Sequence, residues 1–180
     1  MLPLRSEIEP FSQRGTGTMG ERFQVRVTKD YLVFCSGHFI SYEGDQCERL
    51  HGHNYRVAVE VEGALDSNHY VFDFIALKNR TRELVDELDH RMLVAMKGTV
   101  IQAEVDDRRV RLTYRDREWI FPREDCVLLP IENTTAELLA KYLAGRLREV
   151  LAQRHQYHPE VIRVEVEEAF GQWATYEHRA

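Results

Sequence analysis

The sequence predicts an α+β domain, and two kinds of hydrophobic periodicity carry this prediction. Two segments, 53–62 and 161–168, alternate apolar with polar residues, which is typical of half-buried strands. Two others, 77–88 and 134–151, repeat apolar residues every three or four positions, which is typical of amphipathic helices. Because strands and helices do not follow a regular β-α-β order and hairpin signals are present, we expect antiparallel pairing.

The N-terminal part of the chain is expected to begin with a tail and to continue in strands. Residues 1–21 show no periodicity and contain Pro, Ser, Gly, Thr and Arg, so we expect a flexible tail before a single domain over 22–180. From Phe23 the apolar residues alternate as in a strand, and an apolar piece at 31–34 leads to His38. The clearest strand follows and ends at Gly63.

The C-terminal part is expected to hold the helices and an insertion. A helix over 77–88 comes first, and the second begins at Thr134, whose spacing to Glu137 fits a capping box. Between them, three alternating pieces separated by turn residues predict an inserted β-hairpin or three-stranded meander at about 97–129.

Composition excludes several classes of protein. The chain has 180 residues, with 24 Lys plus Arg against 30 Asp plus Glu, and its net charge of −6 argues against a dedicated nucleic-acid binder. No apolar run approaches the roughly 20 residues of a membrane-spanning helix. The N-terminus lacks the pattern of a secretion signal, and three cysteines without a Cys-x-x-Cys pair suit reduced thiols. We therefore expect a cytoplasmic, soluble protein.

Three histidines form a candidate metal site. His51 and His53 lie two positions apart at the start of a strand, so their side chains project from the same face, roughly 6 to 7 Å apart at the backbone. With His38, they supply three neutral nitrogen donors that can hold zinc at about 2.0 to 2.1 Å and leave a fourth position open. The alternative is structural, with His53 a core residue and His51 a turn residue.

Four further residues are candidates for chemistry. Cys47 lies four residues before His51 in an expected loop, where a nearby metal or imidazolium would lower the pKa of its thiol; the alternative is a small buried apolar residue. Asp89-His90 can transfer protons, or can simply end a helix favourably. Glu168 continues an apolar strand face, which is costly unless it meets a hydrogen-bond donor such as a ligand N–H group; the alternative is a frayed strand end.

Six ordered blocks of sequence resemble the 6-pyruvoyl-tetrahydropterin synthase family. The similarity extends from Phe23 to Tyr176, apart from the insertion. The three-residue gap between Cys47 and His51 is similar to the 6-carboxytetrahydropterin synthase branch. The blocks are Phe34-x-x-x-His38, Cys47-x-x-x-His51-Gly52-His53-Asn54-Tyr55, Val71-Phe72-Asp73-Phe74 with Leu77-Lys78, Leu88-Asp89-His90-Arg91, Thr135-Ala136-Glu137, and Glu168 with Trp173-Ala174-x-Tyr176.

This resemblance implies a fold and a set of site residues. The fold would be the tunnelling fold, a four-stranded antiparallel sheet with two helices on one face, whose trimers close into barrels and stack as hexamers with sites at subunit interfaces. The implied roles are zinc binding by His38, His51 and His53, catalysis by Cys47, Asp89 and His90, and pterin binding by Thr135, Glu137 and Glu168.

The resemblance also implies an activity. The chain looks like a zinc-dependent 6-carboxy-5,6,7,8-tetrahydropterin synthase, which converts 7,8-dihydroneopterin triphosphate with loss of triphosphate and acetaldehyde in queuosine and deazapurine precursor synthesis. A homo-oligomer, trimer or hexamer, would bind this small molecule without nucleic acid or membrane. The alternatives are 6-pyruvoyl-tetrahydropterin synthase or a related pterin side-chain lyase, and a non-catalytic pterin-binding or scaffold protein.

Overall fold

The computed structural model describes residues 21–180, so the expected tail lies almost entirely outside the described residues. The helices are α1 (Phe74–Leu88), α2 (Ala136–His155) and the short 3-10 turn η1 (Arg123–Asp125). The strands are β1 (Phe23–Val27), β2 (Val33–His38), β3 (Ser41–Tyr42), β4 (Gln46–Cys47), β5 (His51–Gly63), β6 (Arg91–Ala95), β7 (Gln102–Val105), β8 (Arg109–Tyr114), β9 (Arg117–Pro122), β10 (Cys126–Leu129), β11 (Val161–Ala169) and β12 (Gln172–Arg179).

The main sheet is built around the long strand β5. Within the described residues it has seven strands in the order β10-β6-β2-β5-β11-β12, with β1 paired to β5 as well. Strand β2 pairs with the first part of β5 and β1 with its last part, and β11 and β12 complete an antiparallel layer. The predicted antiparallel pairing is therefore confirmed.

Strands β6 and β10 extend this layer by parallel pairing, β6 to β2 and β10 to β6. The sequence did not predict them, because both are short and largely apolar. Met92, Leu93 and Val94 are consecutive buried residues of β6, and a strand buried on both faces shows no alternation.

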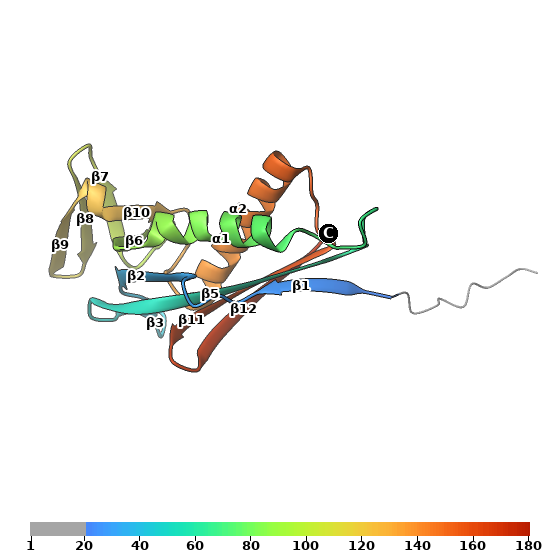
Figure 1. The fold of residues 1–180 in the computed structure, drawn as a ribbon. Coiled ribbons are helices and arrows are strands. Elements are labelled where there is room, and N and C mark those ends of the chain that lie inside the picture. Colours follow the sequence, from blue (N-terminus) through green and yellow to red (C-terminus); the bar gives the residue numbers. More distant parts are fainter. Residues whose placement is uncertain (1–20) are drawn as a thin grey trace, which may run out of the picture.

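Both helices lie over one face of the sheet (Figure 1). The core between them contains stacked rings of Phe34 and Tyr55, whose centroids are 4.6 Å apart, with Leu77 of α1 and Leu143 of α2. Helix α1 begins after Asp73, whose carboxylate accepts a 2.6 Å hydrogen bond from the Ala76 amide. An acceptor at the cap satisfies an amide that has no partner within the helix, which fixes where the helix begins.

Helix α2 begins one residue later than the predicted capping box. Its cap is Thr135, whose hydroxyl accepts a hydrogen bond from the Leu138 amide. Thr134 is buried instead, and its hydroxyl donates to the Phe39 carbonyl. The prediction of Thr134 as the cap was wrong because this tertiary hydrogen bond turns its side chain into the interior.

The segment between β6 and β10 forms a separate three-stranded antiparallel sheet, β7-β8-β9, which we call the meander. It stands at one end of the molecule, beyond the helices (Figure 1). Buried residues of β8 form a second apolar cluster with Phe39, Cys47 and Met92. The meander is thus packed against the part of the chain that carries Cys47.

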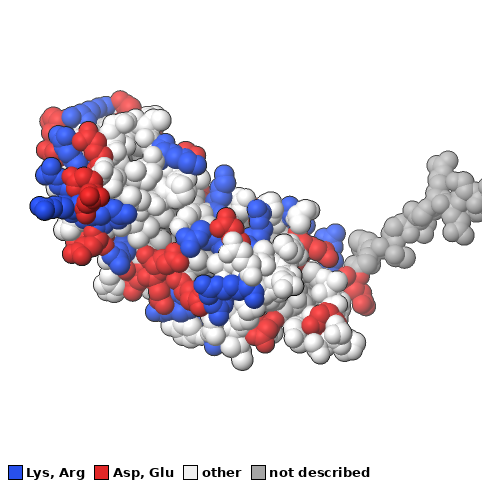
Figure 2. Space-filling model, turned by 90° about the horizontal axis from the view of Figure 1, so that it is seen from above, with Lys and Arg blue, Asp and Glu red and all other residues white. Residues whose placement is uncertain are grey.

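Charged residues of both signs are interspersed on the face of the molecule seen from the helix side, including the end formed by the meander (Figure 2). On the meander Arg109 pairs with Asp106, and Arg111 with Glu104 and Glu118. Among the described residues, no helix combines the length and apolar character needed to span a membrane.

Candidate functional site

Three imidazoles meet where β2 and β5 pair. In the antiparallel register His38 lies opposite His51, and Ser36 lies opposite His53, so the three histidines share one face of the sheet. Their potential ligand atoms all lie within 4.8 Å of one another. The predicted convergence of these residues, which we call the histidine cluster, is confirmed.

Gly52, between the two histidines of β5, permits this close pairing. A Cβ atom at this position would lie 3.0 Å from the Ser36 carbonyl oxygen of β2. Any larger residue at this position would therefore push β5 away from β2, the strand that carries His38.

Backbone carbonyl groups orient two of the three rings. The His38 Nδ1 atom lies 3.0 Å from the Thr134 oxygen, and the His51 Nδ1 atom lies 2.8 Å from the Arg49 oxygen. A carbonyl oxygen only accepts, so Nδ1 carries the hydrogen in both rings, and in the neutral ring the lone pair is then on Nε2. A ligand histidine is commonly held in this way by an acceptor on its other nitrogen.

His38 is the most enclosed member of the cluster, with 1 % of its surface exposed. Burial lowers its pKa to about 4, although the hydrogen bond to Thr134 acts in the opposite direction. Its ring is therefore neutral at physiological pH, as metal binding requires. Three imidazole donors suit zinc and similar divalent transition metals better than hard cations such as magnesium.

Glu168, which the sequence placed on the apolar face of its strand, lies in β11 beside the histidine cluster. Its Oε1 atom is 3.5 Å from His38 Nε2 and 3.5 Å from the Tyr55 hydroxyl, and 29 % of the side chain is exposed. A carboxylate on a partly exposed side chain next to the cluster can accept hydrogen bonds from the N–H groups of a ligand.

Tyr55 is a further member of the site, which the sequence analysis placed in a strand and in a motif without assigning it a role. Its hydroxyl lies 3.0 Å from His38 Nε2 and also reaches Glu168. Burial, reinforced by the charge of Glu168, raises the pKa of Tyr55, so the residue stays a neutral phenol that can donate. The available signal was its position two residues after His53, on the same face of β5.

Cys47 lies close in sequence to the cluster but is not one of its members. Its thiol is buried in the apolar cluster beneath the meander and hydrogen-bonds to the Glu48 carbonyl oxygen at 3.3 Å. Burial raises the pKa of this thiol, and the charge of Arg117 opposes that rise. The expectation of a lowered pKa is therefore not met, because desolvation outweighs the nearby positive charge.

Asp89 and His90 form a hydrogen-bonded pair directly after α1. The His90 Nδ1 atom is 2.9 Å from Asp89 Oδ2, and the His90 side chain is 82 % exposed. The Cys35 amide donates to Asp89 Oδ1 at 2.7 Å. Partial burial acts to raise the pKa of Asp89, but the hydrogen bonds from Cys35 and His90 together bring it below its usual range.

His90 lines an open groove with Cys35, Ser36, Gly37, His51 and Gly52. Cys35 and Gly37 alternate along β2 with Ser36 and His38, so the groove lies mainly on the sheet face opposite the histidine cluster. The structure therefore brings Asp89 and His90 together, but it places them across the sheet from the metal-site candidates.

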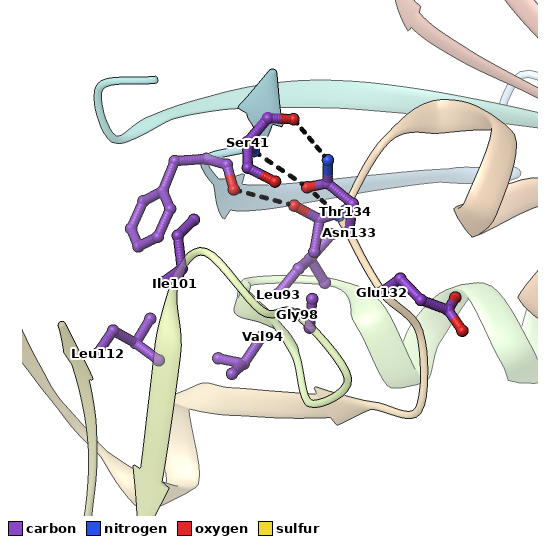
Figure 3. A pocket seen from close by; sticks show the side chains of 11 residues that line it. Ser41, Leu93, Val94, Gly98, Ile101, Leu112, Glu132, Asn133 and Thr134 are labelled. Atoms are coloured by element: carbon purple, nitrogen blue, oxygen red, sulfur yellow. Dashed lines mark hydrogen bonds between the residues drawn. The ribbon is translucent and has the colours of Figure 1, made fainter. Parts of the chain in front are cut away.

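The residues that lead into α2 support the site through Asn133, which the sequence did not single out, and through Thr134, which was expected only to start the helix. Thr134 orients His38, and the neighbouring Asn133 side chain accepts from the Ser41 amide at 3.3 Å and donates to the Ser41 carbonyl at 2.8 Å (Figure 3). Of the predicted pterin-binding residues, Thr135 caps the helix and Glu137 is exposed in its first turn. Motifs alone did not show which of these adjacent polar residues caps the helix and which one orients His38.

Comparison with known proteins relates this arrangement to one family. The model of the family described as 6-pyruvoyl tetrahydropterin synthase matches residues 26–179. A relative from Methanocaldococcus jannaschii, described provisionally as a 6-carboxy-5,6,7,8-tetrahydropterin synthase, is 34% identical over 146 residues, which cover 81% of this chain and 89% of that protein. The 6-carboxy-5,6,7,8-tetrahydropterin synthase of Aquifex aeolicus is 31% identical over 137 residues, covering 73% and 78% of the two chains.

A solved structure shows the same architecture. The crystal structure of 6-pyruvoyl tetrahydropterin synthase from Plasmodium vivax superposes with a TM-score of 0.81 at 29% sequence identity, covering 89% of this chain and 100% of that one. The two helices and the curved sheet are thus those of the tunnelling fold, as the resemblance implied. The chain belongs to the 6-pyruvoyl tetrahydropterin synthase family, whose enzymes are lyases of pterin metabolism.

Proposed function

We propose that the protein is a zinc-dependent 6-carboxy-5,6,7,8-tetrahydropterin synthase that acts on 7,8-dihydroneopterin triphosphate and releases triphosphate and acetaldehyde. The observation that carries the proposal is the histidine cluster with the Glu168 carboxylate 3.5 Å from its most buried ring. Curated relatives with this name, at 34% and 31% identity, favour the carboxy product. That product would feed queuosine and related deazapurine synthesis.

In this proposal His38, His51 and His53 would hold the ion, and His38 and His51 would do so through Nε2, the nitrogen that is not bonded to a backbone carbonyl. The Nδ1 hydrogen bonds of His38 and His51 to backbone oxygens fix the ring orientations before the ion binds. When bound, zinc supplies a Lewis acid that polarises oxygen atoms of the substrate side chain.

Glu168 would orient the pterin rather than break bonds. Its carboxylate can accept hydrogen bonds from the amino and amide N–H groups of the ring, which places the side chain of the substrate toward the histidines. Tyr55 donates to the same carboxylate and so restrains its position. Thr135 and Glu137, at the start of α2, are the further proposed contacts to the pterin.

Cys47, Asp89 and His90 are the proposed groups that move protons. The Asp89 carboxylate fixes the His90 ring through Nδ1, which leaves Nε2 on an exposed ring free to exchange a proton with substrate or thiol. Because His90 lies across the sheet from the cluster, we propose that a second copy of the chain completes each site.

Assembly as a homo-oligomer fits the open edges of the main sheet. Within the described residues, β1 pairs only with β5 and β12 only with β11. Unpaired strand edges are suited to pairing with another chain. We propose that three copies join β1 to β12 in a closed barrel and that two such trimers stack.

A second candidate is 6-pyruvoyl tetrahydropterin synthase itself, which the similarity to the Plasmodium vivax structure favours. The two activities share the substrate and differ in product. Mass spectrometry after incubation with 7,8-dihydroneopterin triphosphate distinguishes 6-carboxytetrahydropterin plus acetaldehyde from the pyruvoyl product. Binding of substrate without conversion would instead identify a non-catalytic pterin-binding protein.

A further inference from the structure

The meander holds the short hairpin that carries Cys47. This hairpin, β3 and β4, turns at Glu43–Asp45, where Glu43 and Gly44 have positive φ values. The Tyr114 hydroxyl donates a 2.7 Å hydrogen bond to the Asp45 carbonyl oxygen, and Arg117 Nη2 donates a 3.0 Å bond to the Cys47 carbonyl oxygen. Both contacts engage the backbone, so they fix the path of the hairpin itself.

The Arg117 guanidinium is held in place by aromatic rings. It lies 4.7 Å from the centroid of Tyr114 and 5.3 Å from that of Trp119. Trp119 in turn packs on Phe39, which directly follows β2, with centroids 4.7 Å apart. A planar guanidinium that stacks on rings loses little further freedom when it donates to a carbonyl group.

The other side of the hairpin is fixed independently. Ser41 lies opposite Cys47 in the hairpin register, and both of its backbone groups bond to the Asn133 side chain (Figure 3). Asn133 precedes the cap of α2, next to the threonine that orients His38. Cys47 is therefore held between the meander on one side and, on the other, the segment of Asn133 and Thr134 that orients His38.

We propose that the meander is a positioning element for Cys47 and that Arg117 is its principal positioning residue, which holds the thiol-bearing backbone in register with the histidine cluster. The inference rests on the proposed function for its catalytic consequence. The Arg117 charge also acts against the effect of burial on the Cys47 pKa, so the same residue favours the thiolate.

The test compares Arg117→Ala with wild type in the full-length, zinc-loaded protein. We expect hydrogen–deuterium exchange of residues 41–47 to accelerate at least about tenfold, since the hairpin loses its anchored carbonyl. We expect kcat on 7,8-dihydroneopterin triphosphate to fall about tenfold with KM within about twofold, since Arg117 does not touch the proposed pterin contacts. The pH midpoint for alkylation of Cys47 should rise, with exposed Cys35 as the internal reference.

Two variants make the comparison specific. Arg111→Ala removes an arginine from the same sheet that pairs with Glu104 and Glu118, and it should leave all three measurements unchanged. Arg117→Lys keeps the charge without the planar donor, and it should restore the alkylation midpoint more fully than the exchange rate. If Arg117→Ala does not fold, Tyr114→Phe removes only the hydroxyl bond to Asp45 and provides the same exchange and alkylation measurements.

The proposal stands if hairpin exchange accelerates together with a lower kcat or a higher alkylation midpoint. Any other combination, including unchanged exchange, overturns it. If the wild-type protein does not convert the substrate, the proposed function fails, while exchange and alkylation still decide whether Arg117 positions Cys47.

Discussion

At the residue scale, neighbouring groups orient the rings of the histidine cluster for binding a metal ion. Two rings present Nε2 because their Nδ1 atoms donate to backbone carbonyls, and the most buried ring is neutral. Glu168 adds the only carboxylate that the described residues place against His38. In the proposed function, metal affinity and pterin affinity therefore depend on different side chains, and mutation should separate them.

Replacing Glu168 with Gln should weaken substrate binding without loss of metal. Removal of a charged acceptor for ring N–H groups is expected to raise KM roughly 10- to 100-fold. Steady-state kinetics and metal analysis measure the two effects. Glu165→Gln is the matched control, because Glu165 lies on the same strand but pairs with Arg26. An unchanged KM in Glu168→Gln would contradict the assigned role.

The buried His38 should make the metal-free protein sensitive to acid. Its folded-state pKa of about 4 lies below the ordinary value of 6.5, so between these pH values the unfolded chain binds a proton that the folded chain does not. The resulting stability is complete above pH 6.5 and is lost as pH falls toward 4, by about 3 kcal/mol. The free energy of unfolding, measured with urea at several pH values across this range, should depend less steeply on pH for His38→Gln than for wild type. Equal dependence on pH in the two proteins would refute the assignment.

At the element scale, three consecutive residues at the start of α2 have three different roles. Thr135 caps the helix, Thr134 orients a histidine and Asn133 anchors the Cys47 hairpin.

Periodicity predicted both helices and the strands on either side of them, because each has one polar and one apolar face. It did not predict β6 and β10, which lack that contrast, or which threonine caps α2, which a hydrogen bond to Phe39 decides.

The cap has a measurable energy. Thr135→Ala removes the acceptor for the Leu138 amide and should lower the free energy of unfolding by about 1 kcal/mol. Thr135→Ser keeps an acceptor oxygen and should remain within about 0.5 kcal/mol of wild type. Chemical denaturation of both variants tests the assignment, and equal losses would show that the hydroxyl group is not the stabilising feature.

At the scale of the whole molecule, one chain does not bring all the proposed groups together. The histidine residues and Glu168 could be located from motifs because they lie on alternating strands, where face follows from position. The separation of His90 from the cluster could not be predicted in this way, since it depends on how β6 joins the edge of β2. Association of several copies is the arrangement that reconciles this geometry with the proposed reaction.

Oligomerisation should therefore accompany activity. Light scattering is expected to give three or six times the mass of one chain. Mixing Cys47→Ala with His90→Ala protein, after dissociation and reassembly, should restore part of the activity that each lacks, because some interfaces then combine an intact Cys47 with an intact His90. A monomeric, fully active protein would contradict the shared site.

The most direct test of the central claim is product analysis with zinc-loaded protein and 7,8-dihydroneopterin triphosphate, beside a chelator-treated sample. We predict 6-carboxy-5,6,7,8-tetrahydropterin and acetaldehyde in equal amounts, with both products absent after chelation and restored when zinc is returned. Unchanged substrate, or full turnover in the chelated sample with no metal bound, would contradict the account.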